Sequence, residues 1–231
     1  MGRRWWTVRA RVLTPETIAY HQAGHVVVAY EFGWWVPRGG VRLGAWAHAR
    51  LRHREVDYTV LGASDNMMLA RVCISMAGLL AEEKFLGQQW RFEEDVVRHL
   101  RAVRAGEDEG LCMYPSDLRA IALALLDHDP PISLAGARRV VTHCRNVTNA
   151  LLDDPRVWAG AERLAKALYR RRYLSPRAVK KVLGDAYFAD AGRTIRDSQF
   201  QRGGGCAGAV VGCAGAAVAY HQYPPSGRPR L

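Results

Sequence analysis

The chain has 231 residues, of which 49% are hydrophobic, 24% are charged and 9% are aromatic. This amount of apolar material excludes wholesale disorder and suits one substantial globular domain. The 33 Lys and Arg residues outnumber the 22 Asp and Glu residues, which gives a net charge of +11. An acidic partner or a nucleic acid therefore has to be considered as a ligand.

The compartment is indicated by cysteine usage and by the start of the chain. Five cysteines occur without a CxxC pair, which argues against a disulfide framework and favours a reducing compartment. The basic start lacks the apolar core of a secretory signal, and the longest apolar run is too short to cross a bilayer. We therefore expect a cytoplasmic protein.

Composition divides the chain into three parts. Residues 1–13 form a basic N-terminal arm without a periodic pattern, and residues 14–190 carry the pattern of a folded domain. Residues 191–231 are rich in Gly and Ala and cannot build a dense core, so we expect a flexible tail there.

The first predicted helix lies between Thr14, a good N-cap, and Gly33, a stop signal. Pro15 suits its first position. Its second half is apolar on nearly every face, which is typical of a buried helix. Short stretches between 34 and 62 then predict two or three strands of a small sheet, whose edge at 41–51 could accept a peptide as an extra strand.

The rest of the domain is predicted to be helical. A strongly apolar helix at about 66–86, closed by Gly87, is expected at the centre of the core. Further helices are predicted at 92–103, 116–126, 137–152, 155–172 and 176–187. The fold class is therefore mainly α (α+β), with a small β-sheet beside the first helix.

His21 and His25 are four residues apart on the first helix, so one helical turn places both imidazoles on one face. Zinc binds imidazole nitrogen at about 2.0–2.1 Å, and this spacing lets two rings reach one ion. Two histidines at this spacing also arise by chance, so further motifs are needed to support a metal site.

Three segments supply that support. They read YHQAGHVVVA (20–29), AGLLAEEKFLG (77–87), and a helical hairpin at 151–183. In this order they resemble the peptidase domain of the FtsH family, the membrane AAA zinc proteases. The resemblance implies a helical peptidase fold that holds Zn²⁺ through His21 and His25. The ATPase half and the membrane anchor of the family have no counterpart in the sequence. We therefore expect a stand-alone peptidase domain, for which an ATPase acting in trans is a possible partner.

The sequence departs from the family pattern at Gln22, which follows the first histidine where the family has Glu. That Glu is the general base, and an amide cannot accept a proton near neutral pH. General acid–base catalysis contributes about 10²–10⁴-fold to rates. The substitution predicts a peptidase whose activity on unfolded or peptide substrates is weak or lost. The alternative is a non-enzymatic helical module that binds a peptide or partner on the same scaffold.

The resemblance also implies a third ligand, an Asp near the start of a later helix. Asp117 in the string PSDLRAIALAL matches the family context better than Asp95 in FEEDVVRHL, so we favour Asp117 and keep Asp95 as the alternative. Each of these aspartates could instead serve only the dipole of its helix.

Two charged features are open to two interpretations. Glu82 and Glu83 could orient the histidines, but such a pair more often forms the solvated end of an apolar helix. The cations between 163 and 181 most often form a solvated helical face. We do not expect nucleic-acid binding, because no known module is legible. The oligomeric state is not predicted.

Overall fold

The computed structural model describes residues 14–34, 36, 39–43, 65–89, 93–105, 116–127 and 132–189. The predicted N-terminal arm, the Gly/Ala-rich tail and most of the predicted strands between 44 and 62 lie outside these residues. The described elements are α1 (Pro15–Glu31), β1 (Val41–Arg42), α2 (Asp65–Leu86), α3 (Glu93–Arg104), α4 (Ser116–Leu126), α5 (Leu134–Asp153), α6 (Pro155–Arg171), β2 (Tyr173–Leu174), α7 (Pro176–Leu183) and α8 (Asp185–Ala189). None of the described helices is long and apolar enough to cross a membrane.

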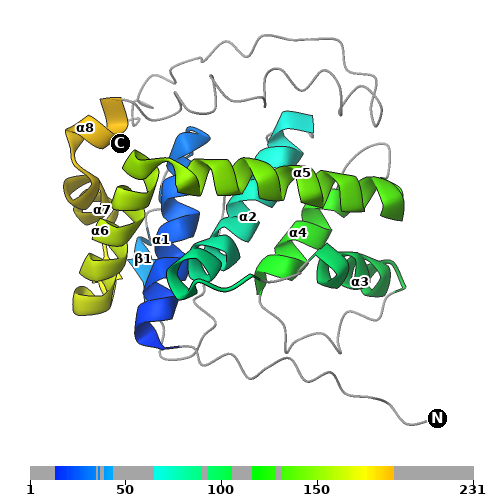
Figure 1. The fold of residues 1–231 in the computed structure, drawn as a ribbon, viewed down its shortest axis with the longest axis horizontal. Helices are drawn as coiled ribbons and strands as arrows, with labels where there is room; N and C mark the ends of the chain where they lie inside the picture. Colours follow the sequence, from blue (N-terminus) through cyan, green and yellow to red (C-terminus); the bar gives the residue numbers. More distant parts are fainter. Residues whose placement is uncertain are drawn as a thin grey trace, which may run out of the picture.

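The expected fold class is confirmed: the described chain is mainly helical with one small antiparallel sheet (Figure 1). Within that sheet, Val41 of β1 is opposite Leu174 of β2, and Arg42 is opposite Tyr173. The sequence did not predict β2. Its two residues become a strand because β1, from the other end of the domain, supplies the backbone hydrogen bonds.

Helix α1 begins and ends where its sequence signals predict. The Thr14 side chain accepts a hydrogen bond from the backbone N–H of Thr17 at 3.1 Å, and Pro15 occupies the first helical position. After the last turn, Gly33 adopts a positive φ of 75°, a conformation that glycine reaches without steric cost. Most of the helix is buried, as its apolar pattern indicates.

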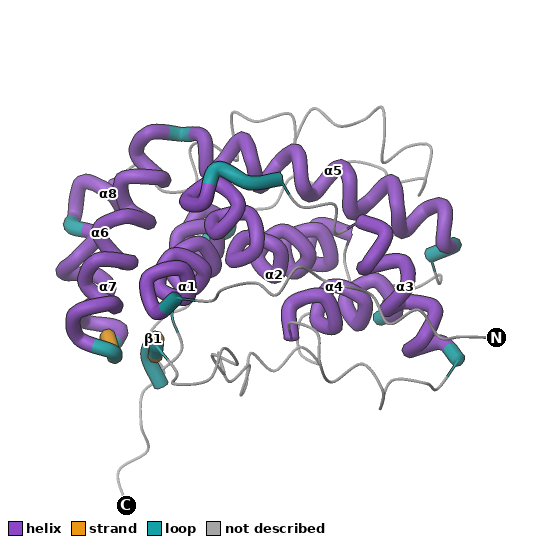
Figure 2. Tube along the Cα trace, turned by 60° about the horizontal axis from the view of Figure 1, so that its bottom comes forward, coloured by secondary structure: helices purple, strands orange, loops and turns teal. Residues whose placement is uncertain are grey.

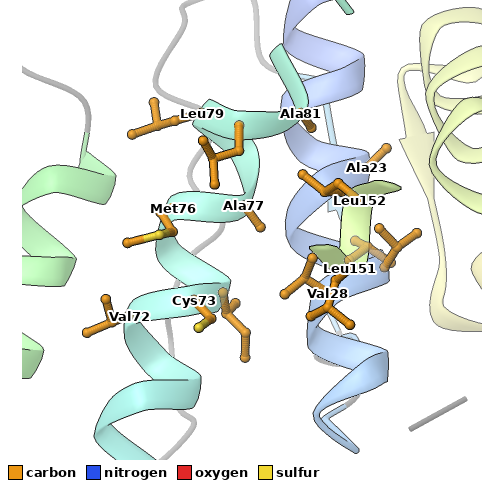
Figure 3. Packing of buried hydrophobic residues seen from close by; sticks show 14 of the residues in the cluster. Ala23, Val28, Val72, Cys73, Met76, Ala77, Leu79, Ala81, Leu151 and Leu152 are labelled. Atoms are coloured by element: carbon orange, nitrogen blue, oxygen red, sulfur yellow. The ribbon is translucent and has the colours of Figure 1, made fainter. Parts of the chain in front are cut away.

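Helix α2 forms the centre of the domain and packs against α1, α4 and α5 (Figures 1 and 2). Small side chains face α1 where the two helices approach, among them Ala77 and Ala81 (Figure 3). The approach depends on Gly24 of α1, because a Cβ there would lie 2.5 Å from the Ala77 carbonyl oxygen and 2.5 Å from the Ala81 Cβ. Side-chain volume thus sets the α1–α2 separation.

The other helices cover this pair from two sides. Helix α6 packs on α1, and the ring of Tyr20 stacks on Phe85 of α2 at 4.0 Å and on Trp158 of α6 at 5.8 Å between centroids. Helices α4 and α5 pack on α2, and α3 packs on both of them. In both views α6, α7 and α8 lie at one end of the molecule and α3 lies at the other (Figures 1 and 2).

Two predicted boundaries were wrong. The helix expected to begin at 137 begins at Leu134, because the Ser133 hydroxyl accepts a hydrogen bond from the Gly136 N–H at 3.0 Å and caps an earlier turn. The helix expected over 176–187 is divided into α7 and α8 at Gly184, whose φ of 81° interrupts the helical backbone.

A buried charge pair joins α1 to the C-terminal helices. Glu31 is fully buried, and its two carboxylate oxygens each accept a hydrogen bond from an Arg156 guanidinium nitrogen at 2.9 Å. The Arg156 guanidinium carbon also lies over the ring of Tyr187 of α8, 5.0 Å from the ring centroid. The Tyr187 hydroxyl donates a hydrogen bond to the Val27 carbonyl at 3.3 Å. The Glu31–Arg156 pair therefore ties α6 to α1, and Tyr187 ties α8 to both helices.

Candidate metal centre

His21 and His25 lie on one face of α1, as their spacing predicts. Their Nε2 atoms are 3.0 Å apart. His25 is almost completely buried, with 4% of its surface exposed. The predicted helix therefore brings two imidazole nitrogens to a single point inside the domain.

A carboxylate from α4 meets these nitrogens. The Oδ2 atom of Asp117 is 3.0 Å from His21 Nε2, and its Oδ1 atom is 3.5 Å from His25 Nε2. Each of the three residues offers one ligand atom, and these atoms all lie within 4.8 Å of one another. In the described part of the chain, this group has the residue types and the spacing to hold a metal ion.

The alternative third residue, Asp95, lies elsewhere. Its carboxylate accepts a hydrogen bond from Arg98 on the next turn of α3 at 2.9 Å, and its backbone carbonyl accepts one from the His99 ring at 2.9 Å. It occupies the first turn of α3, where a negative charge stabilises the helix dipole. The structure thus brings Asp117, and not Asp95, to the two histidines.

Helix α2 orients both imidazole rings from behind. The Nδ1–H of His25 donates to the Ile74 carbonyl oxygen at 2.7 Å, and His21 Nδ1 lies 2.6 Å from Glu82 Oε1. The hydrogen bond at His25 Nδ1 fixes the tautomer of that ring and leaves its Nε2 lone pair available, and the Glu82 carboxylate lies beside Nδ1 of the other ring. Both Nε2 atoms face Asp117 and are the atoms that could bind a metal ion.

The two adjacent glutamates of α2 have different partners. Glu82 is 2% exposed and contacts His21. Glu83 turns towards α5, where its carboxylate lies 3.1 Å from Arg145. Of the pair proposed from the sequence to orient the histidines, the structure places only Glu82 beside them.

The space beside the ligand nitrogens suits a small ion. A Cβ at Gly78 of α2 would lie 2.4 Å from His25 Nε2 and 2.7 Å from His21 Nε2. The glycine therefore keeps open a space that one carbon atom would fill. Two imidazoles and one carboxylate are also a donor set that Zn²⁺ uses in catalytic sites.

The charges of the centre reinforce one another. Burial alone would raise the pKa of Asp117, but the two facing imidazoles lower it well below its usual 3.8. Burial alone would lower the pKa of His25, but the Asp117 carboxylate outweighs this and raises it above 6.5. Asp117 is therefore ionised at neutral pH and favours any cation placed between the rings.

Gln22 follows His21 on α1 and is buried, with 1% of its surface exposed. Its amide oxygen has no hydrogen-bond partner within the described part of the chain. A buried acceptor of this kind normally has a partner, often a water molecule or a ligand. An acceptor at this position is compatible with a polar ligand nearby.

Fold and site together describe a helical domain with a buried His/His/Asp cluster able to hold a metal. No protein-family model matches the chain, and no solved structure matches it. The chain is 26% identical over 210 residues to the mitochondrial inner membrane m-AAA protease component AFG3L2 of Mus musculus, a match that covers 79% of this chain. It covers 24% of the mouse protein, so the chain spans only a small part of that relative's length. The match supports a distant relation to the FtsH family.

Sequence reasoning did not identify two contributions from α2. The Ile74 carbonyl and Gly78 both lie next to the histidines, on the same side of α2 as Glu82. Positions 74, 78 and 82 are four residues apart and therefore share one helix face. This periodicity was visible in the sequence, but nothing showed that the face meets α1.

Proposed function

We propose that this chain is a zinc metallopeptidase-like protein of the FtsH peptidase family, with His21, His25 and Asp117 as the ligands of Zn²⁺. The convergence of these three residues from α1 and α4, with ligand atoms within 4.8 Å of one another, carries the proposal. Bound there, Zn²⁺ supplies Lewis-acid activation of a water molecule or a peptide carbonyl. Glu82 and the Ile74 carbonyl hold the two rings in position for it.

We further propose that Gln22 makes hydrolysis weak or absent. The residue stands where the family has its general base, and a neutral amide can donate and accept hydrogen bonds but cannot take up a proton near pH 7. General acid–base catalysis contributes about 10²–10⁴-fold. The ligands do not depend on this residue, so zinc binding is expected to persist.

The second candidate function is a non-enzymatic module that binds a peptide or a partner protein on the same scaffold. Gln22 is the observation that favours it, because the proposed ligands are all present while an amide replaces the general base of the family. An unfolded or peptide ligand, and an ATPase acting in trans, are the partners that belong to this proposal. The cytoplasmic location stays a prediction.

Metal analysis of the purified chain tests the centre. We expect about one equivalent of zinc in the wild type and almost none in His21→Ala, because two ligands do not hold the ion firmly. His143→Ala is the matched control, since His143 lies on α5 outside the cluster, and it should bind zinc like the wild type. A wild-type protein without zinc would refute the metal centre.

Digestion of an unstructured casein substrate tests catalysis. Gln22→Glu restores a proton acceptor, so cleavage is expected in that variant and should disappear again in Gln22→Glu/His21→Ala. Cleavage confined to Gln22→Glu identifies a disabled peptidase. Efficient cleavage by the wild type would refute the role given to Gln22, and zinc-loaded protein inactive in both forms would favour the binding module.

A further inference from the structure

We infer that Gly78 is a positioning residue of the metal centre: the missing side chain leaves the two histidine rings free to converge on an ion. The inference rests on the proposed metal centre and adds to it a residue that makes no bond to the metal. Its basis is the distance of a Cβ at position 78 from the two ligand nitrogens, 2.4 Å to His25 Nε2 and 2.7 Å to His21 Nε2.

These distances are too short for a methyl group and an unmoved ring to coexist. Non-bonded carbon contacts are optimal at about 3.5–4.0 Å, and both distances fall well below that range. An ion bound by both rings would itself lie about 2.0–2.1 Å from each Nε2 atom. A methyl group at 78 would therefore force both nitrogens away from the place where they can share one ion.

The rings cannot turn away at no cost, because the same helix holds them at their other nitrogens. The Ile74 carbonyl, one turn before Gly78, accepts the bond from His25 Nδ1 at 2.7 Å. Glu82, one turn after it, lies 2.6 Å from His21 Nδ1. Moving either ring away from Gly78 stretches one of these contacts, so the three successive turns of α2 act together on the site.

A second glycine at the same helix crossing has a different function. A Cβ at Gly24 of α1 would meet the Ala77 carbonyl oxygen and the Ala81 Cβ, both at 2.5 Å, and would contact neither histidine closely. Gly24 serves the packing of α1 on α2, whereas Gly78 serves the convergence of the imidazoles. A third glycine, Gly39, has no atom of the described residues, apart from its chain neighbours, within 4 Å of its Cβ position. The three positions form a matched series.

The test compares Gly78→Ala, Gly24→Ala and Gly39→Ala with the wild type by zinc titration, by the visible spectrum of bound Co²⁺, and by thermal melting in a chelator. Gly78→Ala should bind zinc about 10–100-fold more weakly and lose the tetrahedral Co²⁺ spectrum. Its melting midpoint in chelator should fall less than that of Gly24→Ala, because the atoms met at 78 are the movable ends of two imidazoles, whereas a Cβ at 24 meets the Ala77 backbone carbonyl. Gly24→Ala should melt earlier with or without metal, and Gly39→Ala should change neither property.

The outcomes separate this inference from the proposed function. Normal zinc affinity in Gly78→Ala, beside a zinc-binding wild type, overturns the inference and leaves the metal centre standing. A wild type that binds no zinc overturns both. If Gly78→Ala does not fold, the double variant Gly78→Ala/His25→Ala decides: recovery of folding in chelator supports the close contact with the His25 ring, and continued failure overturns it.

Discussion

Two buried polar clusters begin on α1, and they differ in what they need to be complete. At the C-terminal end of the helix, the Glu31 carboxylate meets the Arg156 guanidinium through two hydrogen bonds of 2.9 Å. The charges cancel and the geometry is bidentate, which is the strongest form of such a pair. Nothing outside the chain is required, so this cluster is structural.

The second cluster lies in the middle of α1 and is not self-sufficient. There His21 and His25 present two Nε2 atoms to the carboxylate of Asp117. With both Nδ1 atoms directed to α2, three acceptors face one another, and such an arrangement calls for a proton or a cation. Buried polar groups that satisfy one another's hydrogen bonds indicate a structural role. Buried acceptors that converge on one point indicate a binding site for a proton or a cation.

Arg156→Ala should give the largest change in stability. It leaves the fully buried Glu31 carboxylate without its partner, and breaking a buried pair in this way costs about 3–5 kcal/mol. Urea unfolding measures the loss, and zinc binding by the folded protein should not change. The double variant Arg156→Ala/Glu31→Gln, which removes the orphaned charge, should recover part of the stability. A loss below about 1 kcal/mol would show that the cluster does not hold α6 on α1.

Glu82→Gln should weaken the metal centre and leave the fold intact. The amide keeps the size of the side chain but removes the negative charge beside His21 Nδ1. Changes to such supporting groups typically reduce metal affinity by about 10–100-fold. Glu83→Gln is the matched control, because Glu83 contacts Arg145 and not a histidine. Competition with a chelating dye measures both affinities, and equal affinities in the two variants would contradict the role assigned to Glu82.

The effect of pH should have opposite signs in the metal-free and metal-loaded protein. The raised pKa of His25 stabilises the chelated protein below pH 6.5, and this contribution is lost as the pH rises through the folded-state pKa. The lowered pKa of Asp117 contributes stability above pH 3.8 that is lost as the pH falls. Zinc requires neutral imidazoles and becomes more stabilising as the pH rises.

The gap between the melting midpoints with zinc and with chelator should therefore widen from about pH 6 to about pH 8. Melting curves recorded at matched ionic strength measure it. In Asp117→Asn the gap should be small at every pH, because the loss of the proposed third ligand leaves two imidazoles that hold zinc only weakly. A gap that is constant in the wild type across this range would contradict the proposed ligand set.

The smallest effect is expected at the α6–α7 end. Eight cations there are exposed, namely Arg163, Lys166, Arg170, Arg171, Arg172, Arg177, Lys180 and Lys181. Because Lys166 has no ion pair with a carboxylate of the described residues, Lys166→Gln should change the free energy of unfolding by less than about 0.5 kcal/mol. Urea unfolding beside Arg156→Ala, on the same helix, measures the contrast. A loss comparable to that of Arg156→Ala would show that this face is not merely solvated.

Most of the helical framework follows from local signals. Thr14 and Pro15 begin α1, and Gly33 follows its end, as these residue types predict. The boundary errors arose where one local signal overrode another. The N-cap at Ser133 begins α5 one turn earlier than the apolar pattern predicts, and Gly184 ends α7 although the apolar pattern continues. Strand β2 could not be predicted, because its partner is remote in the sequence and isolated two-residue strands have no periodicity.

Within the site, the sequence by itself determined the pairing of His21 with His25, because helix periodicity places residues four apart on one face. It also determined that the residue directly after His21 is Gln22, an amide, rather than an acid. These features depend only on local order along one helix.

Only the tertiary structure decided which carboxylates reach the histidines. Asp95 and Asp117 both begin helices, and Glu82 and Glu83 are neighbours, so local patterns rank them poorly. The packing of α4 on α2 brings in Asp117, and the rotation of α2 against α1 turns Glu82, not Glu83, towards His21. Helix rotation and crossing depend on side-chain volumes contributed by several segments at once, and no single segment encodes them.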